Sequence, residues 1–186
     1  MPTLLRRIWR ELLGGEFVEV LQPYRISRPR FVRNRDNELS KTVEFVARQL
    51  LATCPKLDGN LILILIDADK DLPCAIAPTI LSAAQVARSD VDIICVAAVT
   101  EYESWFVAAA ESLSQFLAPD AIAQLPSPPL REKHGKGWIQ RSWRGSAYSE
   151  TIDQARLTNS MDLAMCRAHS PSFDKLCREL EIRRNR

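Results

Sequence analysis

Six consecutive aliphatic residues, followed at once by alternating acids, constrain the fold of this chain more than any other stretch. The run LILILI occupies residues 61–66, and Asp67, Asp69 and Asp71 follow it. An apolar run of this length, rich in isoleucine, predicts a central strand of a parallel sheet that is buried on both faces. Carboxylates do not belong inside such a sheet. We therefore expect the acids to lie at the carboxyl end of the strand, where open α/β sheets place their ligands.

The spacing of the first two acids suggests a metal site. Asp67 and Asp69 are two residues apart, so their side chains point the same way if the backbone stays extended. Two converging carboxylates repel each other unless a cation joins them, and oxygen ligands of this kind suit Mg²⁺ or Mn²⁺. The alternative is a solvated acidic turn that closes a strand, because the Asp-x-Asp pattern is common.

Hydrophobic periodicity predicts that helices and strands alternate in the first half of the chain. Helical spacing covers residues 3–13, 38–53 and 75–88, and strand patterns cover 16–21, 61–66 and 91–99. The order predicts an α/β fold, with a mostly parallel sheet flanked by helices and joined by right-handed crossovers.

A second group of acids follows the last of these strands. Glu101 and Glu103 lie in the segment TEYESWF, which leads into a helix through about residue 116. If the two strands are neighbours, Glu103 can reach the same cation as Asp67 and Asp69. The alternative is that Glu103 only favours the start of a helix through the helix dipole.

The second half of the chain is predicted to be a loop followed by helices. Residues 118–148 are rich in proline and basic residues, and we expect a flap with little regular structure apart from a short helix at 119–125. Helices are predicted over 149–168, interrupted around 157–160, and over 173–182 with Ser172 as the N-terminal cap. The expected organisation is an α/β core at 1–117, a flap at 118–148 and a C-terminal helical extension at 149–186 that packs on the core.

Two clusters of basic residues interrupt an otherwise even charge distribution. Five arginines lie within residues 25–35, and five basic residues lie within 131–144, with Trp138 and Trp143 among them. Such clusters suit phosphate contacts with aromatic stacking, and solvated loops are the alternative. The residues that we predict to contact nucleic acid are Arg25, Arg28, Arg30, Arg33, Lys133, Lys136 and Arg141.

Composition favours a soluble cytoplasmic protein. Hydrophobic residues make up 46% and charged residues 26% of the chain, which is ordinary for a globular domain. No apolar run approaches the ~20 residues that a membrane helix needs, and residues 1–7 lead into an amphipathic helix. The five cysteines lack CxxC spacing, which favours reduced thiols.

Four segments together resemble an uncharacterised bacterial Toprim-like family. They are ILILIDADKD, VAAVTEYESWF, PYRISRPRF and the closing YSETIDQARLTNSMD with SPSFDKLCREL. The resemblance covers nearly the whole chain, and the Asp-x-Asp and Glu-x-Trp-Phe patterns are its most specific parts. Genes of this family often neighbour ABC- or SMC-like ATPases in mobile and phage-defence loci. The wider Toprim group includes topoisomerases, primases and nucleases, which use acids around Mg²⁺ to make or break phosphodiester bonds.

The resemblance implies a Mg²⁺-dependent nuclease. Asp67 and Asp69 match the Toprim pair that holds the metal, Asp71 extends it, and Glu103 matches the glutamate before the family's tryptophan. Asp67, Asp69 and Glu103 are thus the predicted catalytic residues, and all four acids are predicted metal ligands. The resemblance also implies nucleic acid as substrate, DNA ahead of RNA, and an ABC/SMC-like ATPase as partner.

Two departures from the Toprim pattern support a rival interpretation. Toprim domains open with a strand and a glutamate, whereas this sequence begins at the following helix, so we expect either an upstream start or a lost strand. A lost strand would leave a sheet edge that suits a partner strand or a homodimer. Toprim nucleases also have a lysine near Ser149 and Glu150, and Lys133 or Lys136 can substitute for it.

The rival is a non-catalytic Toprim-like binding or regulatory subunit of an ATPase. A nucleotide- or phosphate-binding protein ranks last, because the sequence has no glycine-rich phosphate loop.

Overall fold

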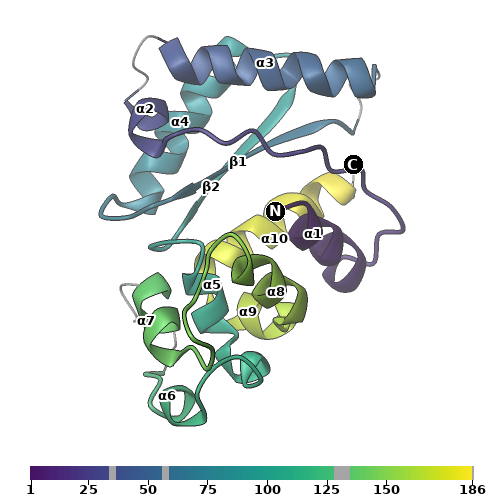
Figure 1. Cartoon of the computed structure of the whole chain (residues 1–186). Coiled ribbons are helices and arrows are strands. Elements are labelled where there is room, and N and C mark those ends of the chain that lie inside the picture. The colour runs from purple at the N-terminus through teal and green to yellow at the C-terminus, as the bar shows by residue number, and fades with distance from the viewer. Residues whose placement is uncertain (34–36, 56–58, 128–134, 186) are drawn as a thin grey trace. The chain divides into compact units, whose positions relative to one another are not determined.

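The protein divides into two compact units, which are described separately. The structure, a computed structural model, describes residues 1–33, 37–55, 59–127 and 135–185. The first unit combines residues 1–20 with 98–186, and the second unit comprises residues 21–97 (Figure 1). The N-terminal helices therefore belong with the C-terminal helices rather than with the strands.

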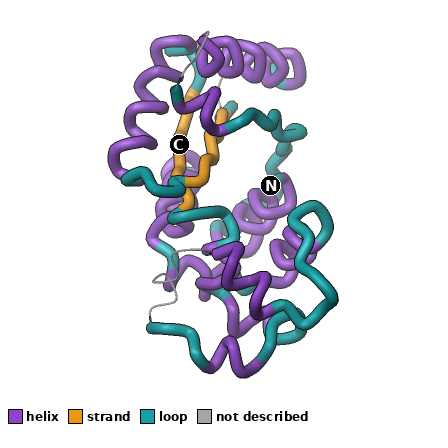
Figure 2. The backbone as a smooth tube through the Cα atoms, turned by 60° about the vertical axis from the view of Figure 1, so that its left-hand side comes forward, coloured by secondary structure: helices purple, strands orange, loops and turns teal. Residues whose placement is uncertain are grey.

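The second unit is a small α/β unit. Its two strands, β1 (Leu61–Asp67) and β2 (Asp92–Ala98), form an open parallel sheet, and Figure 2 shows them side by side. Helix α4 (Pro73–Ala87) makes the crossover between them, as parallel strands require. Helices α2 (Arg28–Val32) and α3 (Glu38–Thr53) precede the strands.

Helices α3 and α4 cover one face of this sheet. Alternate residues of β1, Ile62, Ile64 and Ile66, share a buried core with Leu39 and Val43 of α3 and with side chains of α4. The intervening residues of β1 are only partly buried. Among the described residues β1 pairs with β2 alone, so the expectation of a central strand buried on both faces is wrong.

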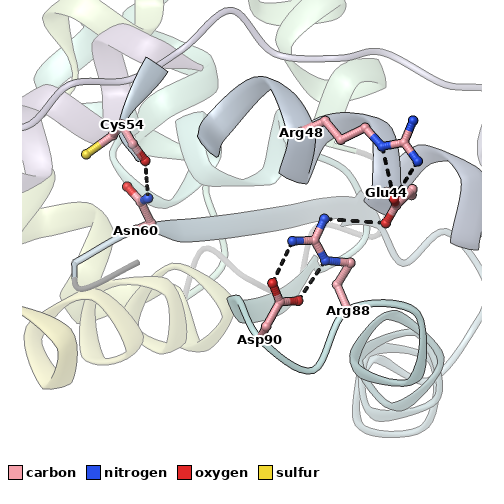
Figure 3. A network of polar contacts seen from close by, with 6 residues as sticks. All are labelled: Glu44, Arg48, Cys54, Asn60, Arg88 and Asp90. Carbon is pink, nitrogen blue, oxygen red and sulfur yellow. Dashed lines mark hydrogen bonds and ion pairs between the residues drawn. The ribbon is translucent and has the colours of Figure 1, made fainter. Parts of the chain in front are cut away.

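An arginine network ties α3 to the segment between α4 and β2 (Figure 3). Arg88 donates to both carboxylate oxygens of Asp90 at 2.7 and 2.6 Å, and to Glu44 of α3 at 3.4 Å. Arg48, one turn along α3, donates to the other oxygen of Glu44 at 2.8 Å. Asn60, just before β1, donates to the carbonyl of Cys54 at 2.9 Å.

The described part of the first unit is helical. Its core contains the fully buried side chains of Trp105 and Phe106, and the ring of Trp105 meets Phe173 edge-on at 5.2 Å. Arg7 donates to the carbonyls of Thr158 and Met161 at 2.7 and 3.0 Å, which ties the N-terminal helix to the C-terminal half. The elements are α1 (Pro2–Arg7), the π-helix η1 (Ile8–Leu12), α5 (Ser104–Ala108), the 3₁₀ helix η3 (Ala110–Leu113), α6 (Pro119–Ala123), α7 (Gly135–Ser142), α8 (Asp153–Ser160), α9 (Leu163–His169) and α10 (Pro171–Arg184).

The structure confirms most predicted elements and corrects several. The expected strand at 16–21 is wrong, because these residues form no strand, and the alternation of that segment marks only an extended connection. The flap at 118–148 is more regular than predicted, since it contains α7 as well as the short helix α6. The predicted helix through residue 116 is divided into α5 and η3.

The cap of the last helix is also two residues earlier than predicted. Ser170, not Ser172, accepts the hydrogen bond from the Phe173 amide, at 3.2 Å. The hydroxyl of Ser172 instead accepts from the indole of Trp105 at 2.9 Å.

No helix in the described residues is both long and apolar enough to cross a bilayer. All five cysteines are free thiols, as predicted.

Candidate functional site

The acids after β1 lie in a tight turn. Asp67 is the last residue of β1, and the Asp71 amide donates to the Ala68 carbonyl at 2.9 Å. Asp69, inside this turn, has a φ of 52°. Aspartate tolerates this left-handed region better than most residues. The backbone therefore does not stay extended after Asp67, and α4 begins soon afterwards.

Arg28, the first residue of α2, lies against this turn. Its Nε donates to the Asp67 carbonyl at 2.7 Å, and its terminal nitrogen donates to the Ala68 carbonyl at 3.1 Å. The same guanidinium pairs with the Asp69 carboxylate at 3.2 Å and with the Asp71 carboxylate. Oxygen atoms from four residues in or beside this turn, Asp67, Ala68, Asp69 and Asp71, thus converge on one cationic group.

This convergence bears on the predicted metal site. Two carboxylates and two carbonyls are the hard oxygen donors that Mg²⁺ prefers, so the chemistry of the donor set fits a divalent cation. In the part of the chain that the structure describes, no three carboxylate, thiol or imidazole side chains converge on one point. Arg28 is the cation around which these oxygens are arranged here.

The second predicted acidic group lies in the first unit, at the start of α5. Glu103 is 5% exposed. Its Oε1 accepts a hydrogen bond from the Tyr148 hydroxyl at 3.1 Å and from the Gln154 amide at 3.4 Å. Burial, together with the charge of Glu103, raises the pKa of Tyr148. The phenol therefore stays protonated and continues to donate to the carboxylate.

Helix α7 begins against the start of α5. The Lys136 amide donates to the Glu101 carboxylate at 3.0 Å. A Cβ added to Gly135 would lie 2.4 Å from the Ser104 backbone nitrogen, so only glycine permits this approach. The buried Ser104 hydroxyl has no partner among the described residues.

The basic residues that were predicted to contact nucleic acid fall into different environments. Arg25, Arg30 and Arg33 are exposed around α2, and Arg141 is exposed at the end of α7. Arg28 is instead 25% exposed and paired with the acids. Lys136 forms an ion pair with Glu150, which raises the pKa of Lys136. Lys133 lies outside the described residues.

Sequence reasoning missed the partners of both acidic groups. It assigned Arg28 to nucleic acid, although the side chain holds the turn after β1. It did not single out Tyr148 or Gln154 as partners of Glu103. Neither pairing has a signal in residue spacing, because each joins segments far apart in the chain. The only sequence feature that pointed to such pairs was the presence of both arginines and acids in the four segments that resemble the Toprim-like family.

Comparison with known proteins assigns the chain to a family. The model of a family described as Domain of unknown function (DUF4276) matches residues 2–181. The chain belongs to the DUF4276 family. No curated protein and no solved structure matches it. The DUF4276 assignment agrees with a domain of unknown function, and kinship with Toprim domains stays a prediction.

Proposed function

We propose that this DUF4276 protein is a Mg²⁺-dependent nuclease of Toprim-like type, which cleaves phosphodiester bonds in a bacterial defence system. The observation that supports it most is the convergence of the Asp69 and Asp71 carboxylates and the Asp67 and Ala68 carbonyls on one cationic group. A set of oxygens that already binds a guanidinium is a set that favours positive charge.

In this proposal Asp67, Asp69 and Asp71 would hold Mg²⁺ or Mn²⁺, and Glu103, which belongs to the other unit, stays a predicted ligand or water-orienting group. The metal, when bound, activates water and stabilises the leaving oxygen. Arg28, displaced from the carboxylates, would contact a phosphate oxygen, for which its planar fork is suited. Tyr148 and Gln154 hold the Glu103 carboxylate in place.

The exposed arginines Arg25, Arg30 and Arg33 would track the nucleic-acid backbone without distinguishing sequence. Lys136 and Arg141, with Lys133, would neutralise charge that develops during cleavage. The substrate class is DNA ahead of RNA, and the compartment is the cytoplasm.

The test is cleavage of labelled DNA and RNA with Mg²⁺ or Mn²⁺. We expect the wild-type chain to cut, Asp67→Asn to lose activity while it stays folded, and Asp120→Asn to keep activity. Asp120 is a matched control because it is an exposed acid in α6, outside both acidic groups. Equal cleavage by wild type, Asp67→Asn and Asp69→Asn would reject the metal-site assignment, because Asp67→Asn alone keeps the main-chain carbonyl that contacts Arg28.

A second function is favoured by Arg28 itself. A guanidinium that pairs with both Asp69 and Asp71 removes the need for a metal there. This suits a non-catalytic Toprim-like subunit that binds or regulates an ABC/SMC-like ATPase. Such a subunit would act as a monomer or as a homodimer. If this function is correct, the protein copurifies with an ABC/SMC-like ATPase and Arg28→Gln gains no cleavage activity. Cleavage by the purified wild-type chain would exclude it.

A further inference from the structure

A groove in the first unit is lined by aromatic and basic side chains. Its volume is about 440 Å³, and its lining includes Phe116, Trp143, Arg144, Ile152 and Arg156. It contains none of the acids assigned to cleavage above. Its residues come from the segment after η3, the segment after α7, and α8, all within one unit.

Three planar groups are stacked in this groove. The rings of Phe116 and Trp143 lie within 4° of parallel, with centroids 6.0 Å apart. The guanidinium of Arg156 lies over the Phe116 ring, 5.7 Å from its centroid. Tyr148 meets the Trp143 ring edge-on at 5.5 Å, which adds a third ring to this aromatic cluster.

The Arg156 guanidinium is fixed in position and accessible. Arg156 pairs with Asp153 at 3.3 Å, and Asp153 is fixed in turn by the Ser149 amide at 2.9 Å. The Asp153 side chain is 8% exposed, whereas that of Arg156 is 60% exposed. A solvent-exposed planar cation that lies over an aromatic ring is thus held by a buried carboxylate.

This arrangement suits a nucleobase joined to a phosphate. Bases stack on guanidinium planes and aromatic rings irrespective of sequence, because every base has a π-face. Arg144, which donates to the Ser114 carbonyl at 3.3 Å, adds a second positive charge for the phosphate. Ile152, 64% exposed, offers an apolar contact at the rim. Bases of a duplex are stacked on each other and do not present a free face.

We propose that the groove formed by Phe116, Trp143, Arg144 and Arg156 binds single-stranded nucleic acid, with one base stacked on the Arg156 guanidinium. The inference rests on the proposed nuclease function and names its substrate as a single strand. DNA and RNA share the chemistry that the groove recognises, so the experiment compares both.

The experiment measures binding in EDTA, where cleavage cannot occur. Fluorescence anisotropy follows labelled oligothymidylate and oligouridylate of about 12 nucleotides, and a duplex of the same length. We expect Arg156→Gln to weaken single-strand binding by about tenfold, and to lower the slope of log affinity against log salt by about 0.7. The intrinsic tryptophan fluorescence, to which Trp143 contributes, should also be quenched on binding.

Arg178→Gln is the matched control. Arg178 is on α10 of the same unit, its side chain is also 60% exposed, and it pairs with an aspartate one turn earlier, Asp174. This variant should bind as the wild type does. An equal loss in both variants, an unchanged affinity in Arg156→Gln, or an equal loss for duplex would overturn the groove assignment.

The outcomes also separate this inference from the nuclease proposal. Asp67→Asn should bind single strands normally in EDTA even if it cannot cut. Normal binding that depends on Arg156, together with no cleavage by the wild type, would retain the groove and reject the nuclease. If Arg156→Gln cleaves and binds as the wild type does, the nuclease is retained and the groove is rejected.

Discussion

Arg28 contacts the acids that follow β1, although the sequence predicts nucleic-acid binding for the arginine and metal binding for the acids. It connects the first turn of α2 to the turn after β1 through two backbone carbonyls and two carboxylates. The side chain is 25% exposed, so solvent screens these interactions only in part. It therefore stabilises the turn that presents the acids in the metal-free protein.

Replacement of Arg28 should destabilise the protein measurably. We expect Arg28→Gln to lower the free energy of unfolding by about 1–3 kcal/mol, because it leaves two part-buried carbonyls and two carboxylates without this donor. Urea denaturation at neutral pH measures the change. Arg48→Gln is the control, since Arg48 is 74% exposed and its loss should cost less than about 0.5 kcal/mol. An equal loss of unfolding free energy in the two variants would mean that Arg28 contributes no more to stability than an exposed ion pair does.

At the scale of elements, helix α7 depends on one glycine. A Cβ on Gly135 would lie within 2.8 Å of backbone atoms of both Ser104 and Glu103, and backbone cannot move away as a side chain does. We expect Gly135→Ala to lower the free energy of unfolding by about 1–3 kcal/mol, although alanine favours helices more than glycine does. A stabilised variant, measured by thermal denaturation, would contradict the close packing of α5 and α7.

The contact of α3 with the segment before β2 should be sensitive to acid. Pairing with Arg48 lowers the pKa of Glu44 below its ordinary 4.5, and pairing with Arg88 lowers the pKa of Asp90 below 3.8. Because the folded-state pKa values are depressed, this stabilisation is present above those ordinary values and disappears as pH falls through the folded ones.

The measurement is the difference in melting temperature between wild type and Arg88→Gln. It should be largest near neutral pH and should shrink as the pH falls from about 5 to about 3. Lys41→Gln, the removal of an exposed charge from the same helix, should show no such trend. A difference that is independent of pH would exclude the ion pairs as its source.

The elements with long, regular patterns were predicted well from sequence. The strand over 61–66 and the helix over 38–53 are present at those positions as β1 and α3. A continuous run of aliphatic residues indicates the strand, and burial of one face dictates the periodicity of the helix. The strand predicted at 16–21 was wrong, since alternation over six residues also fits an extended connection. Helix α7 was missed because glycine and basic residues dominate it, and its start is set by packing of Gly135 on α5.

The candidate site was predicted in part. The placement of Asp67 at the end of a strand follows directly from the cost of burying charge. The pairing of Arg28 with Asp69 and Asp71, and of Tyr148 with Glu103, depends on tertiary contacts. No local pattern specifies such contacts, so sequence alone could not find them.

At the scale of the whole molecule, the predicted ligands are divided between two units. Asp67, Asp69 and Asp71 belong to the second unit, and Glu103 belongs to the first. If Glu103 is a ligand, Glu103→Gln should weaken Mn²⁺ binding by about 10–100-fold. Tyr148→Phe, which removes a donor but keeps the carboxylate, should have a smaller effect. Unchanged affinity in Glu103→Gln would confine the metal to the second unit.

The measurement that tests the account most directly is a Mn²⁺ titration followed by electron paramagnetic resonance, in which bound ions lose the signal of free Mn²⁺. The account predicts saturable binding by the wild type, competition by Mg²⁺, and loss of binding in Asp67→Asn and Asp69→Asn but not in Asp120→Asn. Arg28→Gln should bind at least as tightly as the wild type, because the competing cation is gone. Absence of binding in both the wild type and Arg28→Gln would contradict the metal site and leave the ATPase-associated binding subunit as the function.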